Sequence, residues 1–171
     1  MNFFEFFKSL KADHQSSSIN QIHAYLNKKF PNMNDERKVI ISCVCGLLAR
    51  IAYSDFHVSQ NEKSKMQKII TGMTQLNAEE AELITEYSIE KMKELSGLDT
   101  RSYCKPLVEI MSQHERYQIL KALFAIAAAD GEVDNVESNE ISYIANALVL
   151  EKKYFLSAQA DVKEYLKTFQ V

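Results

Sequence analysis

Apolar residues recur along the chain three or four positions apart, and no segment shows the period-two alternation that is typical of a β-strand. This spacing predicts helices in eight segments, given to within a few residues: 19–30, 35–54, 60–74, 78–96, 100–111, 113–129, 135–148 and 151–169. The helix over 35–54 is apolar on several faces, so we expect it to lie at the centre with the others packed around it. The pattern therefore predicts an all-α, single-domain bundle of about seven to eight helices.

Polar residues mark where several of these helices begin. Four starts carry a capping residue followed three positions later by glutamate, the pairs being Ser59/Glu62, Asn77/Glu80, Ser112/Glu115 and Asp134/Glu137. Asp35 is the expected N-cap of the central helix, and Gly97 should end the helix over 78–96. Pro106 should lie near the start of its helix, because a proline deeper inside would remove a backbone hydrogen bond and clash with the preceding turn.

Residues 1–18 are expected to form a separate segment and linker, followed by the helical domain over 19–171. One face of a helix near the start of this segment is apolar and carries Phe3, Phe6, Phe7 and Leu10. Two interpretations stay open. The segment can dock on the domain's own core, or its Phe3–Phe7 part can act as an arm that binds a protein partner or a membrane surface.

Composition excludes several classes of function. Of the 171 residues 46% are apolar, which is enough for one full-sized core. The net charge is −3 and the basic residues are scattered, so nucleic acid is not expected as a partner. The longest apolar run, 39–49, is shorter than the roughly 20 residues of a membrane span. Three cysteines are too few for a disulfide framework, and we expect reduced thiols in the cytoplasm.

Negative charge is concentrated in the segment 130–140. It holds no basic side chain and five carboxylates: Asp130, Glu132, Asp134, Glu137 and Glu140. The first three alternate as in the first half of an EF-hand loop, but the glycine and the later glutamate fall at the wrong positions, so this is not an EF-hand. We hypothesise a looser oxygen site for Ca²⁺ or Mg²⁺. The simpler interpretation is helix capping, although capping uses only two of the five carboxylates.

The same pattern occurs earlier in the chain. When 48–70 is aligned with 123–145, the identical pairs are Leu48/Leu123, Ile51/Ile126, Ala52/Ala127, Asp55/Asp130, Val58/Val133, Glu62/Glu137 and Ile69/Ile144. We therefore predict an internally duplicated helix–loop–helix unit over about 36–75 and 112–148. Asp55 and Glu62 join the candidate ligands if the two loops pack together. The first copy has Phe56 in place of the glycine, and Lys63 and Lys65 are expected to neutralise its carboxylates.

These two stretches resemble a known family. The string Ile-Ala-Ala-Ala-Asp-Gly-Glu-Val-Asp-Asn-Val-Glu over 126–137 looks like the signature of TerB-like domains, and 51–62 resembles its first copy. These domains comprise the tellurite-resistance TerB family and the related N-terminal module of a DnaJ-type co-chaperone. The resemblance implies an all-helical, duplicated bundle associated with stress or tellurite resistance. It also implies that a divalent cation is bound by matching acidic residues: Asp130, Asp134 and Glu137 in the second motif, and Asp55 and Glu62 in the first.

Three functions follow as hypotheses. The favoured one is a non-enzymatic module that binds Ca²⁺ or Mg²⁺ through the acidic set Asp130, Glu132, Asp134, Glu137, Asp55 and Glu62. The second is a protein-interaction adaptor in which these acids serve only as helix caps or as a docking surface. The third, a carboxylate–metal hydrolase, is disfavoured because no nucleophile or general base accompanies the acids.

Overall fold

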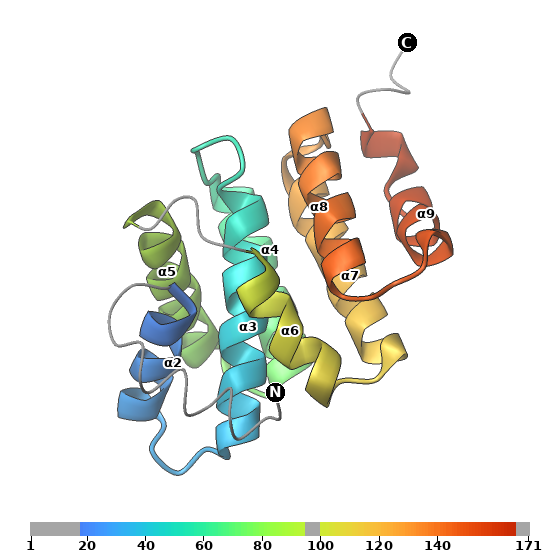
Figure 1. Ribbon diagram of the computed structural model, residues 1–171. Coiled ribbons are helices and arrows are strands. Elements are labelled where there is room, and N and C mark those ends of the chain that lie inside the picture. Colours follow the sequence, from blue (N-terminus) through green and yellow to red (C-terminus); the bar gives the residue numbers. More distant parts are fainter. Residues whose placement is uncertain (1–17, 95–99, 167–171) are drawn as a thin grey trace.

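The computed structural model describes residues 18–94 and 100–166. This part of the chain is all-α and folds as one bundle of eight α-helices (Figure 1), so the predicted fold class is confirmed. The helices are α2 (Ser18–Lys29), α3 (Asp35–Ala52), α4 (Gln60–Thr74), α5 (Ala78–Glu94), α6 (Thr100–Ile110), α7 (Gln113–Ala127), α8 (Asn135–Ala147) and α9 (Lys152–Ala160). Two short 3₁₀ segments are η1 (Ala128–Asp130) and η2 (Lys163–Tyr165). The predictions for the Phe-rich N-terminal segment and for Gly97 fall outside the described residues.

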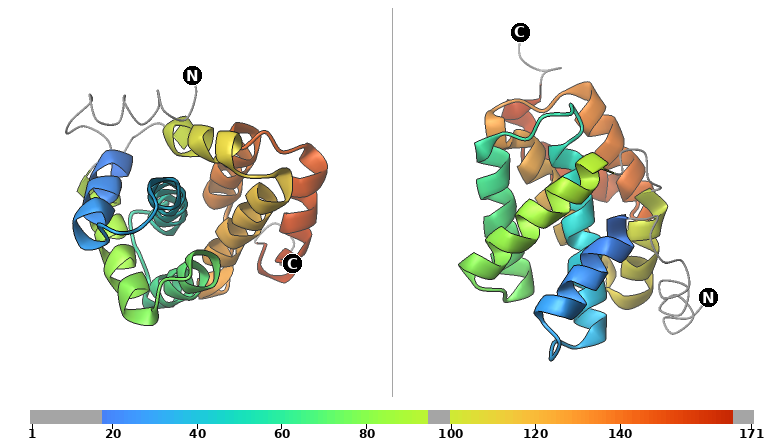
Figure 2. Two further views of the ribbon diagram at one scale, coloured as in Figure 1. Left: turned by 90° about the horizontal axis from the view of Figure 1, so that it is seen from below. Right: turned by 90° about the vertical axis from the view of Figure 1, so that its left-hand side faces the viewer.

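Helix α3 is the centre of the bundle, as its apolar faces predict. The helices α2, α4, α5, α6, α7 and α8 all pack against it, and Figure 2 shows α3 enclosed by its neighbours in the view from below. Its buried residues include Leu47, Leu48 and Ile51, each with no exposed surface. Neither α3 nor any other helix of the described ranges combines the length and the apolar character that crossing a membrane requires.

Close packing between α3 and α6 depends on Gly46. The aromatic ring of Tyr103, on α6, lies directly over this glycine, and a Cβ added at Gly46 would be 2.2 Å from the Cε1 atom of the ring. Tyr103 is itself fully buried. A hydrogen atom in place of a side chain at position 46 therefore determines how near the two helices can approach.

The predicted capping boxes are confirmed. The side chains of Ser59, Ser112 and Asp134 each accept a hydrogen bond from the backbone N–H three residues on, and the glutamate there accepts one in return. The same reciprocal pair joins Asn77 and Glu80, at 2.9 Å in both directions. One cap prediction was wrong by one position: Asn34, and not Asp35, accepts the N–H of Arg37 at the start of α3.

The prediction for Pro106 was also wrong. This proline lies inside α6, with four further helical residues after it. It removes one backbone hydrogen bond from the helix, but the side chains of Tyr103, Cys104 and Leu107 are buried and hold the same helix in the core. Tertiary packing therefore outweighs the local preference.

The last helix is shorter than the predicted 151–169. It ends at Ala160, and the chain turns so that the carbonyl of Tyr165 accepts a hydrogen bond from the N–H of Val133 at 2.6 Å. An isolated parallel β-bridge joins Val133 and Leu166 at the same place. A long-range backbone contact, which helical periodicity does not encode, thus replaces the final turns of the expected helix.

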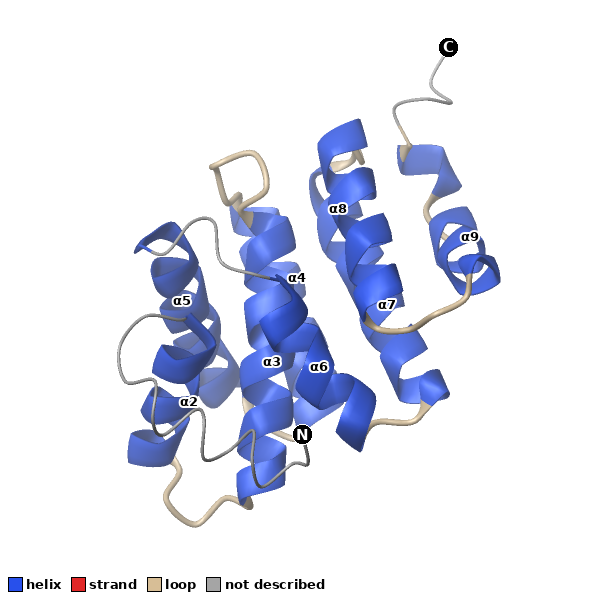
Figure 3. Cartoon of the chain, in the orientation of Figure 1, coloured by secondary structure: helices blue, strands red, loops and turns tan. Residues whose placement is uncertain are grey.

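The connection between α3 and α4 and the connection between α7 and α8 lie at the same end of the bundle, the upper end in Figure 3. Each follows a buried helix and leads into a capping box. These two connections are called the first loop (residues 53–59) and the second loop (residues 128–134). That the two units are copies of one ancestral unit stays a prediction.

Candidate functional site

The two loops have the same internal hydrogen bonding. In the first loop an Oδ1 atom of Asp55 accepts the backbone N–H of His57 at 2.8 Å, and in the second Asp130 accepts that of Glu132 at 3.4 Å. Glu62 and Glu137 follow as the glutamates of the two capping boxes. The aligned aspartates and glutamates of the two motifs therefore occupy corresponding positions in the fold.

Glu62 and Glu137 lie just after the two loops, in the first turns of α4 and α8, and both are shielded from solvent. Glu62 is 7% exposed and Glu137 is half-buried. Burial raises the pKa of Glu137 to about 7, with further contributions from the negative charges of Asp134, Asp130 and Glu62. Burial also raises the pKa of Glu62, assisted by Asp130 and Asp55 and partly opposed by its hydrogen bonds to Ser59. Acids of the two helix–loop–helix units thus act on each other electrostatically, as expected if the loops pack together.

No basic side chain in the described ranges forms an ion pair with the acids just named, which are Asp55, Glu62, Asp130, Asp134 and Glu137. The expectation that Lys63 neutralises the first loop was wrong, because its ammonium group pairs with Glu86 on α5 at 3.1 Å. Lys65 is exposed and lines a different hollow, beside Ala128 and Tyr165. The mutual repulsion of the carboxylates is therefore not offset by neighbouring lysines.

The remaining acids of the second motif are placed differently. Glu140 pairs with Arg50 of α3, Oε1 to Nε at 2.5 Å, and also accepts the hydroxyl of Thr100 at 3.1 Å. Its charge is therefore partly neutralised by a cation of the neighbouring helix–loop–helix unit. Glu132 is half-buried and is not among the charges that raise the pKa of Glu62 or Glu137.

Each capping glutamate uses only one carboxylate oxygen in its cap. Oε2 of Glu62 accepts the N–H of Ser59 at 2.7 Å, and Oε2 of Glu137 accepts the N–H of Asp134 at 3.0 Å. As the side chains stand, the described residues contain no group of three or more His, Cys, Asp or Glu side chains placed to hold a metal ion. A cation would therefore require side chains of this acidic set to turn.

The second loop is also held by the C-terminal part of the chain. Val133 is 2% exposed, and its N–H donates to the carbonyl of Tyr165. Val133 thereby anchors the second loop in the core, and the aligned Val58 is half-buried against the same core. Sequence reasoning did not find the contact with Tyr165, because no pattern links residues so far apart.

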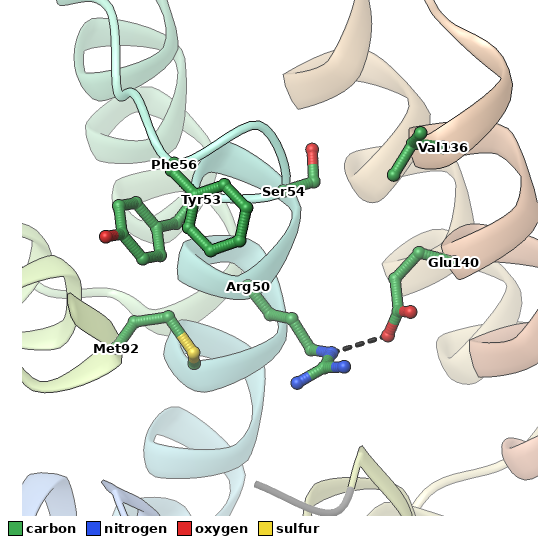
Figure 4. Close-up of a pocket in the computed structure, with 7 residues that line it drawn as sticks. All are labelled: Arg50, Tyr53, Ser54, Phe56, Met92, Val136 and Glu140. Carbon is green, nitrogen blue, oxygen red and sulfur yellow. Dashed lines mark hydrogen bonds and ion pairs between the residues drawn. The ribbon is translucent and has the colours of Figure 1, made fainter. Parts of the chain in front are cut away.

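A hollow of about 180 Å³ separates the first loop from α8 (Figure 4). Arg50 and Glu140 point toward one another across it, while Phe56 and Tyr53 lie on the side of the first loop. The two aromatic rings meet edge to face with centroids 5.7 Å apart. Phe56 is 75% exposed and has a left-handed backbone, with φ of 67°. The Arg50–Glu140 pair thus links the two helix–loop–helix units next to the acidic set.

Thiol groups are remote from this arrangement, and of the described histidines His57 alone belongs to a loop. Cys43, Cys45 and Cys104 are buried and unpaired with one another, and burial raises the pKa of Cys45 to about 12. His23 and His114 lie in α2 and α7, away from His57 of the first loop. The described residues around the acids therefore offer oxygen ligands and no thiolate.

Comparison with known protein families identifies the family of the chain. The model of the family described as "Tellurite resistance protein TerB" matches residues 42–160, which is most of the chain and includes both loops. Neither the curated proteins nor the solved structures include a match to the sequence.

Proposed function

Because the chain belongs to the TerB family, we propose that it is a non-enzymatic helical protein of a tellurite-associated stress response, and that it binds Ca²⁺ or Mg²⁺ between its two loops. The observation that carries the cation-binding part is the pair Glu62 and Glu137. Burial raises the pKa of both glutamates, which follow different loops in the first turns of α4 and α8. The negative charge of Asp130 raises the pKa of both further, and that of Glu62 raises the pKa of Glu137. A divalent cation is the simplest group that relieves such repulsion.

The chemistry of the acidic set selects the type of ion. Carboxylate oxygens are hard ligands and favour Ca²⁺ or Mg²⁺ over zinc, which prefers sites with nitrogen or sulfur. Glu62, Glu137 and Asp130 are the proposed primary ligands, and Asp55, Asp134 and Glu132 are available to supply further oxygens. Each glutamate can keep its cap through Oε2 and offer Oε1 to the ion. Binding must displace the proton that Glu137 holds at lower pH.

The absence of enzymatic activity is part of the proposal. The three cysteines are buried, so no thiol of the described part reaches the loops as a nucleophile. Buried thiols that form no disulfide among the described residues suit a reducing compartment, and we place the protein in the cytoplasm on that basis.

The capping boxes themselves favour an alternative. Glu62 and Glu137 have an evident structural task at the starts of α4 and α8, so the acids can serve only as caps while the domain acts as a protein-interaction adaptor. Glu115 separates the two functions experimentally. It completes an identical capping box at the start of α7, but hydrogen bonds from Ser112 lower its pKa, in contrast to Glu137.

Titration calorimetry with CaCl₂ and with MgCl₂ tests the proposal. We expect saturable binding to the parent protein, loss of binding in Asp130→Asn/Glu137→Gln, and unchanged binding in Glu115→Gln. Glutamine can still cap a helix, so loss of binding in the first variant reports charge and not folding. Equal and negligible heats in all three proteins would leave only the capping function. A tellurite-sensitivity assay on a strain that lacks the gene tests the physiological part separately.

A further inference from the structure

Helix α6 and the C-terminal end of α8 enclose a groove of about 460 Å³ on a part of the surface that the proposed function does not use. Its apolar surface is formed by Val108, Ala147 and Val149. One rim of the groove is formed by charged residues spaced one helical turn apart on α6: Arg101, Lys105 and Glu109. Tyr143, which is 41% exposed, lies one turn before Ala147 and extends the apolar surface along α8.

Val149 is the most unusual residue of this groove. The chain leaves α8 in a Schellman turn, in which the N–H of Leu150 donates to the carbonyl of Ala145 and the N–H of Val149 to that of Asn146, both at 3.0 Å. The position of Val149 in this turn usually carries glycine. Here a β-branched residue has φ of 54°, while 63% of its surface is exposed. A segment that covered the valine would supply apolar burial to offset this backbone strain.

We propose that the groove is occupied by this chain's own N-terminal segment, residues 2–10. A helix over these residues has one narrow apolar face formed by Phe3, Phe6, Phe7 and Leu10. An amphipathic helix of this kind fits a groove with an apolar floor and a charged rim. Four phenylalanines within five positions are otherwise a large apolar surface for one short segment to leave in water.

Chain connectivity favours this occupant over a separate molecule. Residues 11–17 lie between the segment and Ser18, the first residue of α2, and extended they span up to about 25 Å. Helix α2 packs against α3, and so does α6, so the start of α2 and the groove belong to the same bundle around one central helix. Tethering of this kind gives an effective concentration in the millimolar range, which a free partner seldom reaches.

Two other hollows on the described surface suit the segment less well. The hollow beside Phe56 is smaller, about 180 Å³, and contains the Arg50–Glu140 ion pair. A third hollow is lined by Lys65, Lys68 and several small or polar residues. The groove between α6 and α8 therefore matches an apolar helix face better than either of these hollows.

Tryptophan fluorescence of the full-length chain tests this proposal, because the sequence contains no tryptophan. Phe6→Trp introduces a single indole on the apolar face of the segment. We expect its emission to be blue-shifted and protected from acrylamide quenching. Adding Ala147→Glu to the groove, or Phe3→Asp to the segment, should shift the emission to the red and remove the protection. Leu83→Glu, at a position on α5 that is 44% exposed, is the matched control and should have no effect.

Phe3→Asp tests docking of the segment without changing the helical core. Val149→Asp, at a groove position that is 63% exposed, should have the same effect as Ala147→Glu and tests the groove if Ala147→Glu unfolds the domain. Emission typical of solvated indole in the folded Phe6→Trp protein overturns the proposal. So does a blue shift that Ala147→Glu leaves unchanged in a folded protein, because the segment then docks elsewhere. A blue shift that disappears on dilution, together with a fall in molecular mass, assigns the groove to a second copy. A blue shift that appears only with lipid vesicles assigns the segment to a membrane surface.

Discussion

Phe56 and Gly131 occupy corresponding positions in the two loops, and both have a left-handed backbone, with φ of 67° and 100° respectively. Each directly follows the aspartate that accepts a hydrogen bond from the residue two positions on. Glycine adopts this conformation without penalty, whereas phenylalanine does not. The shared geometry at position 56 is therefore maintained against the local preference of its residue.

This relationship predicts the effect of substitutions at position 56. Phe56→Gly should be more stable than Phe56→Ala by about 1 kcal/mol, because both lose the ring and only glycine relieves the backbone. Urea denaturation measures the difference in the free energy of unfolding. Gly131→Ala is the converse control. The added Cβ has open space around it, so only the left-handed backbone is strained, and the free energy of unfolding should fall by about 1 kcal/mol. Equal stabilities of the two Phe56 variants would show that the left-handed conformation is not populated in solution.

The packing of Tyr103 on Gly46 predicts a large effect from one methyl group. Gly46→Ala places a Cβ 2.2 Å from the ring, so we expect a loss of about 2–3 kcal/mol through overpacking between α3 and α6. Gly72→Ala is the matched control in α4, where a Cβ meets nothing within 4 Å. It should gain up to about 1 kcal/mol from helix propensity. Thermal unfolding of both variants checks the pair, and a stable Gly46→Ala protein contradicts the described packing.

The Arg50–Glu140 pair should couple the two helix–loop–helix units energetically. Both side chains are partly buried, each with 24% of its surface exposed, so we expect a coupling of about 1 kcal/mol in a double-mutant cycle. Arg50→Met, Glu140→Gln and the double variant supply the cycle, measured by urea denaturation at low and high salt. The coupling should weaken as salt rises. A coupling of zero at low salt would mean that the ion pair does not form.

The raised pKa of Glu137 predicts how stability depends on pH. Between its ordinary value of 4.5 and the folded value of about 7, the folded state binds the proton more tightly than the unfolded state. Stability without cation should therefore fall as pH rises through this window. Glu137→Gln removes this loss, and after allowance for solvent screening we expect it to be more stable than the parent at pH 8 by roughly 1–2 kcal/mol.

Glu115→Gln should behave in the opposite way in the same experiment. The pKa of Glu115 is lowered by its hydrogen bonds from Ser112, so its charged form stabilises the fold above the unfolded pKa and this contribution is lost as pH falls. The glutamine variant should be slightly less stable than the parent at neutral pH. If both glutamine variants change stability in the same direction, the difference in environment between Glu137 and Glu115 is not real.

Local rules account for what could be predicted from the sequence. Helical periodicity located the eight described helices, and the capping boxes at Ser59, Asn77, Ser112 and Asp134 were found because each depends on residues three positions apart. The same locality explains the errors. The end of α9 depends on a backbone contact with Val133, which no local pattern contains.

In the candidate site, too, local features were predictable and long-range contacts were not. The acids of both loops were identified from spacing and charge, but their surroundings were not. The pairing of Lys63 with Glu86, and that of Glu140 with Arg50, depend on how α5, α3 and α8 pack. These contacts determine the negative charge near the loops. The first leaves Glu62 without the lysine expected to neutralise it, and the second gives Glu140 a cationic partner.

The most direct test of cation binding by the loops is the number of protons released when the cation binds. Calorimetric titration with Ca²⁺ or Mg²⁺ at pH 7, in two buffers of different ionisation enthalpy, measures it. With the pKa of Glu137 at about 7, we predict release of about half a proton per bound ion. Release should be absent at pH 8.5 and abolished by Glu137→Gln, but kept in Glu115→Gln. Binding without proton release at pH 7, or no binding of either ion, would contradict the account.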